Sequence, residues 1–187
     1  MAVTTLDPRT ALIVIDLQKG IVAFPTAHPV ADVIKHARTL ADAFRRSGLP
    51  VVLVNVAGGA PGRAEQPRRS GDFPAGWTDL VPELNQQPQD HLVTKRTWGA
   101  FIGTDLEQYL KSLGVTQVVI VGVSTSIGVE STARQAYERG LNVTLATDAM
   151  TDTNIDAHIN SVTRIFPRLG ETGTSQEIIA LIGKGSA

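Results

Sequence analysis

The sequence contains no cysteine, and this absence excludes several kinds of chemistry. Without cysteine there is no disulfide, no thiolate metal site and no cysteine nucleophile. The absence is typical of a cytoplasmic protein, which is the localisation we expect. Long apolar runs are missing too, since no stretch reaches the roughly 18 residues that a membrane-spanning helix needs. The N-terminal MAVTTLDPRT lacks the basic-then-apolar order of a signal peptide, so we expect no contact with a membrane.

Charge of one sign is also absent. The 187 residues have a formal net charge of -1 and no run of basic residues, so we expect no nucleic-acid partner. The chain is 42% hydrophobic, as in ordinary globular proteins, and its length suits one domain spanning residues 1–187. The four histidines show no metal-ligand spacing, so we expect no metal. Glycines 58, 59 and 62 open a loop instead of a helix and form no dinucleotide fingerprint, so we expect no cofactor.

Short apolar runs alternate with amphipathic segments along the whole chain. The predicted strands are ALIVIDLQ from Ala11, VVLVNV from Val51, HLVTK at 91–95, 118–122, NVTLATDA from Asn142 to Asp148, and a short strand at 170–172. The predicted helices are 30–47, 104–113 with a Thr104–Glu107 capping box, 129–140, 154–166 and 174–182. Residues 57–90 form a long connection rich in Gly and Pro. The alternation predicts a three-layer α/β/α fold with a mostly parallel, Rossmann-like central sheet.

In such sheets, ligands bind at the carboxyl ends of the strands. This rule selects Asp16 after the first strand, Lys95 at the end of the third, and the turn before Gly128 after the fourth. A carboxylate that ends a buried strand has a pKa that is easily raised. The alternatives stay open from sequence alone. Asp16 can be a structural acid bonded to backbone amides, and Lys95 can be an ordinary surface lysine.

Three segments resemble the isochorismatase-like (cysteine hydrolase) superfamily: DLQKG, TKRTWGAFIGTDLEQYL and GVSTSIGVESTARQA. The resemblance implies the family's hydrolase fold, a homodimer or homotetramer, and a cis peptide at Val123–Ser124. It also implies a catalytic set in which Asp16 and Lys95 are joined by a nucleophilic cysteine. In this sequence Gly128 occupies the position of that cysteine, so an acyl-enzyme route through it is closed.

Isochorismatases in this superfamily resemble the chain at the glycine. They hydrolyse a vinyl ether without a nucleophile, and the resemblance therefore implies Asp16 as an acid and Lys95 as its electrostatic partner. The expected substrate is a small carboxylated vinyl ether such as isochorismate. The candidate substrate-binding residues are Gln18, Trp98, Phe101, Ser124 and Thr125. Core or subunit contacts remain the alternative for Trp98 and Phe101, and backbone hydrogen bonds for the two hydroxyls.

Two other functions stay open at this point. The helix VESTARQAYERG is more similar to the amidase branch, so the chain can be a C–N hydrolase that uses a serine, a threonine or an activated water. It can also be a catalytically silent protein that binds a small molecule. The metal-binding Asp-x-His segment of the nicotinamidase branch has no counterpart in NVAGGAPGR.

Overall fold

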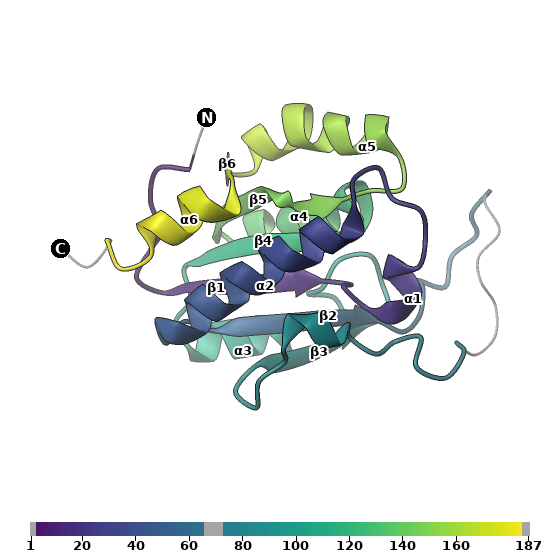
Figure 1. The fold of residues 1–187 in the computed structure, drawn as a ribbon, viewed down its shortest axis with the longest axis horizontal. Helices are drawn as coiled ribbons and strands as arrows, with labels where there is room; N and C mark the ends of the chain where they lie inside the picture. The colour runs from purple at the N-terminus through teal and green to yellow at the C-terminus, as the bar shows by residue number, and fades with distance from the viewer. Residues whose placement is uncertain (1–2, 66–72, 185–187) are drawn as a thin grey trace.

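A computed structural model describes residues 3–65 and 73–184, and its centre is a six-stranded sheet (Figure 1). The strands are β1 (Thr10–Ile15), β2 (Val51–Val56), β3 (His91–Lys95), β4 (Gln117–Val123), β5 (Asn142–Thr151) and β6 (Glu171–Gly173). Their order is β3-β2-β1-β4-β5-β6, and every pairing is parallel. The expected fold class is therefore confirmed, with a sheet that is parallel throughout. The two central strands, β1 and β4, are buried along their whole length, as their uninterrupted apolar runs predict.

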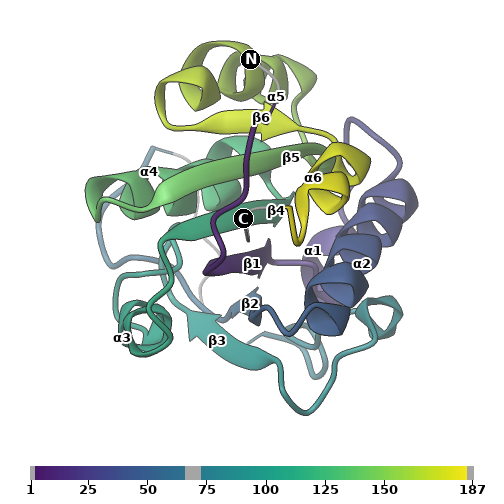
Figure 2. The ribbon, with the colours of Figure 1, turned by 90° about the vertical axis from the view of Figure 1, so that its left-hand side faces the viewer.

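Helices cover both faces of the sheet. They are α1 (Lys19–Val22), α2 (Val30–Arg46), α3 (Leu106–Ser112), α4 (Glu130–Glu138), α5 (Ile155–Asn160) and α6 (Ser175–Leu181). Viewed along the strands, α2 and α6 lie on one side of the sheet, and α3 and α4 lie on the other (Figure 2). Each side has its own apolar core, and the segment that follows α5 joins the second one. No helix among the described residues combines the length and the apolar character needed to cross a membrane.

Gly122, near the end of β4, is required by a close approach between the central strands. Its φ is +120°, and a Cβ at this position would lie 2.0 Å from the carbonyl oxygen of Ile15. The pairing of β4 with β5 also shifts register between Ile120 and Gly122. Only glycine allows the backbones to approach this closely where β1 and β4 end.

Three expected features at element ends differ in the structure. Thr104 forms no capping box: its hydroxyl donates to the Ala100 carbonyl, α3 begins at Leu106, and Glu107 pairs with Lys111 instead. A capping box is formed at α6, between Thr174 and Glu177. The local spacing fits both sites, but the Thr104 hydroxyl bonds to a carbonyl four residues earlier instead.

β5 is longer than expected. It continues past Asp148 to Thr151, so Asp148 lies within the strand, where its carboxylate accepts from the amide and hydroxyl of Ser175 at the start of α6. The helical segment after β5 also extends further, because α5 continues as a π-helical turn (Ser161–Ile165) and a 3-10 turn (Phe166–Arg168) that includes Pro167. Proline is compatible with the first turn of a helix, since its missing N–H has no partner there.

The long connection 57–90 is tied to the body in its second half. Leu84 is fully buried, and Gly20 of α1 lies against the Trp77 indole so closely that a Cβ would overlap it. An antiparallel bridge joins Leu80 to Gln18. Residues 66–72 of this connection lie outside the described residues.

Candidate active site

Asp16 and Lys95 meet at the carboxyl end of the sheet, although their strands are not neighbours. Asp16 follows β1 directly and Lys95 ends β3, so β2 lies between them. Two strand spacings amount to roughly 9.6 Å, which the long lysine stem can cover. The Lys95 Nζ lies 2.7 Å from Asp16 Oδ2, and the two side chains are only 2% and 7% exposed. The sequence rule that selected these two residues from separate strands thus identified a pair in direct contact.

The Asp16 backbone has φ +51°, in the left-handed region that aspartate enters more readily than most residues. This conformation ends β1 and turns the chain toward Gln18. The Asp16 amide still donates to the Val54 carbonyl, at 2.9 Å, so the residue remains attached to β2. The position of the carboxyl group is therefore defined by the sheet itself.

Burial raises the pKa of the Asp16 carboxyl to about 6, against the opposing effect of the Lys95 ammonium. Removal from water disfavours the carboxylate more than the nearby cation favours it. Oδ2 is engaged by Lys95, which also donates to the Thr97 carbonyl at 3.2 Å. Oδ1 is buried and has no hydrogen-bond partner among the described residues. Asp16 therefore has one oxygen held by a cation and one buried without a partner among the described residues, and a substantial protonated fraction near pH 6.

Gly128 lies next to this carboxyl group. It belongs to a π-helical turn, Thr125–Val129, between β4 and α4, so it precedes the α-helix instead of opening it. The Val123–Ser124 peptide before the turn is cis, which confirms the expectation from the family resemblance. A Cβ on Gly128 would lie 3.2 Å from Asp16 Oδ2 and 2.8 Å from Ile15 Cγ2. The glycine backbone thus packs directly beside the acid, and a side chain here would require Ile15 to move.

Side chains from the end of β5 and from α5 hold the turn. Asp152 Oδ2 accepts from both the amide and the hydroxyl of Ser126, each at 2.8 Å. The Thr125 hydroxyl lies 2.8 Å from His158 Nδ1. Thr125 is fully buried, so its side chain cannot touch a molecule that arrives from solvent, which argues against the substrate-binding role expected for it. Ser124 is partly exposed, and its carbonyl accepts the amides of Ile127 and Val129.

Gln18 also has a structural task where substrate binding was expected. It is fully buried, and its Oε1 accepts from the Val56 amide at 2.7 Å. Its Nε2 donates to the carbonyls of Val56 and Trp77, at 3.0 and 3.3 Å. Both donor hydrogens of the amide are thereby used. Gln18 consequently links the ends of β1 and β2 to the 57–90 connection, and no donor is left for a substrate.

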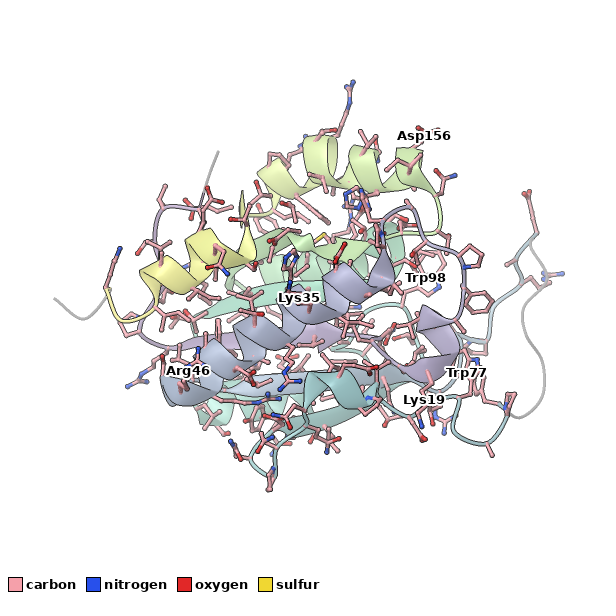
Figure 3. The ribbon with its side chains drawn as sticks, viewed as in Figure 1. Lys19, Lys35, Arg46, Trp77, Trp98 and Asp156 are labelled. Atoms are coloured by element: carbon pink, nitrogen blue, oxygen red, sulfur yellow. The ribbon has the colours of Figure 1, made fainter. Side chains whose placement is uncertain are left out.

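The two aromatic candidates separate from each other. Phe101 is 4% exposed and packs in the core with α3 and α4, with the Arg139 guanidinium 4.7 Å from its ring centre. It is a core residue, because α4 covers it, and the sequence could not distinguish this from a site wall. Trp98 is 65% exposed, and Figure 3 shows it toward the same end of the molecule as Trp77. Trp98 therefore remains available to a ligand or to another chain.

A cavity of about 430 Å³ lies at the opposite end of the sheet, where β5 and β6 begin. Asp7, Asn142 and Glu171 are among its lining residues, whereas Asp16, Lys95 and Gly128 are not. The paired carboxyl and ammonium groups and the general position of ligands in parallel sheets favour the other end of the sheet as the active site. No cluster of three or more acidic or histidine side chains suited to a metal ion occurs in 3–65 or 73–184.

Parallel strands, a buried Asp–Lys pair and a glycine-bearing turn at the sheet's carboxyl end define a candidate active site of an α/β protein. The chain matches the isochorismatase domain model over residues 10–177. It is 41% identical, over 91% of its length and 93% of the relative's, to the uncharacterized isochorismatase family protein YwoC of Bacillus subtilis. An isochorismatase family protein from Burkholderia thailandensis has a TM-score of 0.92 and 39% identity, covering 95% of this chain and 97% of the other. N-carbamoylsarcosine amidase from Thermoplasma acidophilum has a TM-score of 0.74 and 27% identity, covering 89% and 96%.

The chain therefore belongs to the isochorismatase family, and it is a hydrolase. Sequence reasoning missed Asp152 and His158, the residues that hold the turn. Asp152 carried a weak signal, since it follows a strand in a Thr-Asp-Thr-Asn run typical of turns. His158 carried none, because one histidine in a helix is usually a surface or core residue.

Proposed function

We propose that this hydrolase cleaves a small carboxylated vinyl ether by acid catalysis, with isochorismate as the leading candidate substrate. The observation that carries the proposal is the Asp16 carboxyl, whose pKa is raised to about 6 and whose Oδ1 has no partner among the described residues. Since Lys95 donates to Oδ2, the proton of the neutral acid resides on Oδ1. A proton donor with this pKa is effective at mildly acidic to neutral pH.

The reaction requires no covalent intermediate. Asp16 protonates the terminal carbon of the enol ether, and the ether oxygen stabilises the resulting oxocarbenium ion. Water adds to the cationic carbon, and the hemiketal collapses to pyruvate and the diol, 2,3-dihydro-2,3-dihydroxybenzoate. One C–O bond breaks, one forms, and the proton lost from water restores the acid. The ammonium of Lys95 offsets the carboxylate that is left after proton transfer.

Gly128 supports a mechanism without a nucleophile. A chain with no cysteine has no thiol to attack a carbonyl, and a side chain at Gly128 would crowd both Ile15 and Asp16 Oδ2. We infer that Gly128 stands where nucleophile-bearing relatives have cysteine.

C–N hydrolysis is the second candidate, and the likeness to N-carbamoylsarcosine amidase favours it. In that case the ionised Asp16 would act as a base on water. Hydroxyl attack by Thr125 is less suited to the geometry, because its side chain is fully buried. A silent binding protein would take up the same ligands without turnover. Pyruvate release from isochorismate, compared between the wild-type protein and Asp16→Asn across pH, distinguishes the acid-catalysed hydrolase from the other two, and hydrolysis of simple amides then distinguishes a C–N hydrolase from a silent binding protein.

We further propose a cytoplasmic homodimer or homotetramer that acts on a small molecule and binds neither nucleic acid nor membrane. Exposed apolar side chains support the oligomer: Trp98 is 65% exposed, Ile155 44% and Ile159 49%. Light scattering on the purified protein tests this, since a monomer at micromolar concentration would contradict it.

A further inference from the structure

Besides its own hydrogen bonds, such as that from the Thr132 hydroxyl to the Gly128 carbonyl, the turn that carries Gly128 is held by side chains from one other segment. Asp152, His158 and Ser161 contact it or the start of α4: Asp152 holds Ser126, His158 holds Thr125, and the Ser161 hydroxyl donates to Glu130 at 2.6 Å. Of these contacts, only that between His158 and Thr125 joins two buried side chains, which are 8% and 0% exposed. Buried hydrogen bonds of this kind define one arrangement, because breaking them leaves polar groups unsatisfied.

The direction of this hydrogen bond follows from the available acceptors. Among the described residues, His158 Nδ1 is the acceptor at hydrogen-bond distance from the Thr125 hydroxyl, so the hydroxyl donates and Nδ1 accepts. We assign the neutral Nε2–H tautomer to His158 on this ground. Protonation would convert Nδ1 from an acceptor to a donor and leave the buried hydroxyl hydrogen without an acceptor.

His158 is surrounded by groups that act on its charge. The His28 ring lies at 4.6 Å in an edge-on arrangement and is held in place by Thr151 through its backbone amide and its Nδ1. Burial and His28 lower the pKa of His158 below its ordinary value, and Asp152 opposes this. On the α4 side, Glu130 is the nearby charged group, and it is already paired with Arg134 and Ser161. The imidazole is therefore neutral at physiological pH.

We propose that His158 is a positioning residue: by accepting a hydrogen bond from the Thr125 hydroxyl, it holds the turn that carries Gly128 beside the Asp16 carboxyl. The kinetic consequences rest on the hydrolytic function proposed above, whereas the structural consequences do not. Protonation of His158 loosens the turn, so the reaction should lose rate at acid pH by a route separate from the titration of Asp16.

An NMR titration tests the structural part without any substrate. It uses Asp16→Asn as background, because the titration of Asp16 would itself shift the Gly128 amide. We expect the Gly128 amide resonance to follow the His158 imidazole titration, with a midpoint below 6.5, the ordinary value for histidine. Adding His158→Asn should abolish this step, since the Asn Oδ1 accepts from Thr125 but does not titrate. A Gly128 resonance that ignores the His158 titration overturns the proposal.

His28→Asn in the same background is the matched control. It removes the neighbouring charge but not the hydrogen bond to Thr125. The midpoint should therefore rise toward the ordinary histidine value while the step at Gly128 persists. A step that disappears with His28 and remains with His158→Asn would assign the effect to His28 and contradict the proposal.

Kinetics with the substrate that the enzyme turns over test the functional part. His158→Leu, which cannot accept a hydrogen bond from Thr125, should lower kcat at least tenfold at pH 7. His158→Asn should keep kcat at least fivefold above that of His158→Leu and lose the acidic limb of the pH profile. Thr125→Val should lower kcat as much as His158→Leu does. The double variant should have a kcat no lower than that of the less active single variant, because both substitutions remove the same contact.

Melting curves accompany these measurements, and Thr125→Val replaces His158→Leu if the latter does not fold. Equal kcat values for His158→Asn and His158→Leu at matched stability would mean that His158 contributes only packing, and would overturn its positioning role. If isochorismate is not hydrolysed even by the wild-type protein, the proposed function fails, while the NMR titration still decides the role of His158.

Discussion

Replacing Asp16 with asparagine removes the proton donor and changes little else. The amide has nearly the same shape as the carboxyl group, and its oxygen can still accept from Lys95 Nζ, which lies 2.7 Å from Oδ2 in the structure. Loss of a general acid typically costs about 10²- to 10⁴-fold in rate. We therefore expect kcat/KM for pyruvate release from isochorismate to fall by about 10²-fold or more. KM should change less, because substrate contacts outside the acid are retained.

The raised pKa of Asp16 also predicts the direction in which the rate changes with pH. With a pKa of about 6, the Asp16 carboxyl is half protonated at pH 6. The protonated fraction is then about 0.9 at pH 5 and about 0.01 at pH 8, since each pH unit above the pKa lowers it about tenfold. The acid-catalysed rate should fall by the same factor through pH 7 and 8, and the residual rate of Asp16→Asn should lack this fall.

Two outcomes would refute this reasoning. A rate for Asp16→Asn within tenfold of the wild-type rate would remove Asp16 from the chemistry. A rate that rises with pH through 6 would make the ionised Asp16 a base, which is the behaviour expected of C–N hydrolysis by an activated water. Binding of isochorismate without pyruvate release by the wild-type protein would instead favour the silent binding protein.

The raised pKa also predicts how stability depends on pH, which needs no substrate. Because folding raises the pKa of Asp16 from 3.8 to about 6, the folded state holds its proton more tightly than the unfolded state. The stabilisation is complete below pH 4 and is lost as pH rises through 6, by about 3 kcal/mol for a shift of about two units. Chemical denaturation of the wild-type protein and Asp16→Asn at pH 4 and pH 7 measures this. Identical pH dependence of the two proteins would contradict the raised pKa.

Three further predictions concern the strands around the site. Gly128→Cys should lower the vinyl-ether rate at least tenfold and reduce the melting temperature, because its Cβ would lie 2.8 Å from Ile15 Cγ2; amide hydrolysis gained by this variant would indicate an amidase scaffold instead. Gly122→Ala should lower the free energy of unfolding by about 3 kcal/mol, because its Cβ would overlap a backbone carbonyl. Gly59→Ala is the control: its Cβ would lie in open space, so the free energy of unfolding should change by less than about 0.5 kcal/mol. Lys95→Met should raise the pKa of Asp16 further and move the basic limb of the activity profile to higher pH, because the ammonium lowers that pKa. An unchanged basic limb would show that Lys95 does not influence the titration that controls activity.

Periodicity in the sequence was sufficient for the sheet, because a parallel sheet covered on both faces requires uninterrupted apolar strands between amphipathic helices. The same logic identified Asp16 and Lys95 at strand ends. It could not predict the 2.7 Å contact between their side chains, since this depends on β2 lying between their strands and on the reach of the lysine. The order of strands is not encoded in any one segment.

Local patterns failed where a distant residue decided the outcome. Gln18, Thr125 and Phe101 have the chemistry of substrate contacts, yet the structure engages them with Val56, His158 and α4. The Thr104 capping box failed for a local reason, because its hydroxyl donates to the Ala100 carbonyl four residues earlier. The sequence is the same whether such a side chain contacts a ligand or another part of the protein, so it cannot tell the two cases apart.

By itself, the sequence determined the chemical inventory: no thiol, one acid and one lysine at strand ends, and a glycine in the turn beside them. It also determined the parallel architecture, because hydrophobic burial follows periodicity along the chain. Only the tertiary structure decided that the Asp16 carboxyl is buried, that its pKa is about 6, and that His158 supports the turn. These properties depend on desolvation and on contacts between segments far apart in the chain, and both arise only when the strands and helices pack together.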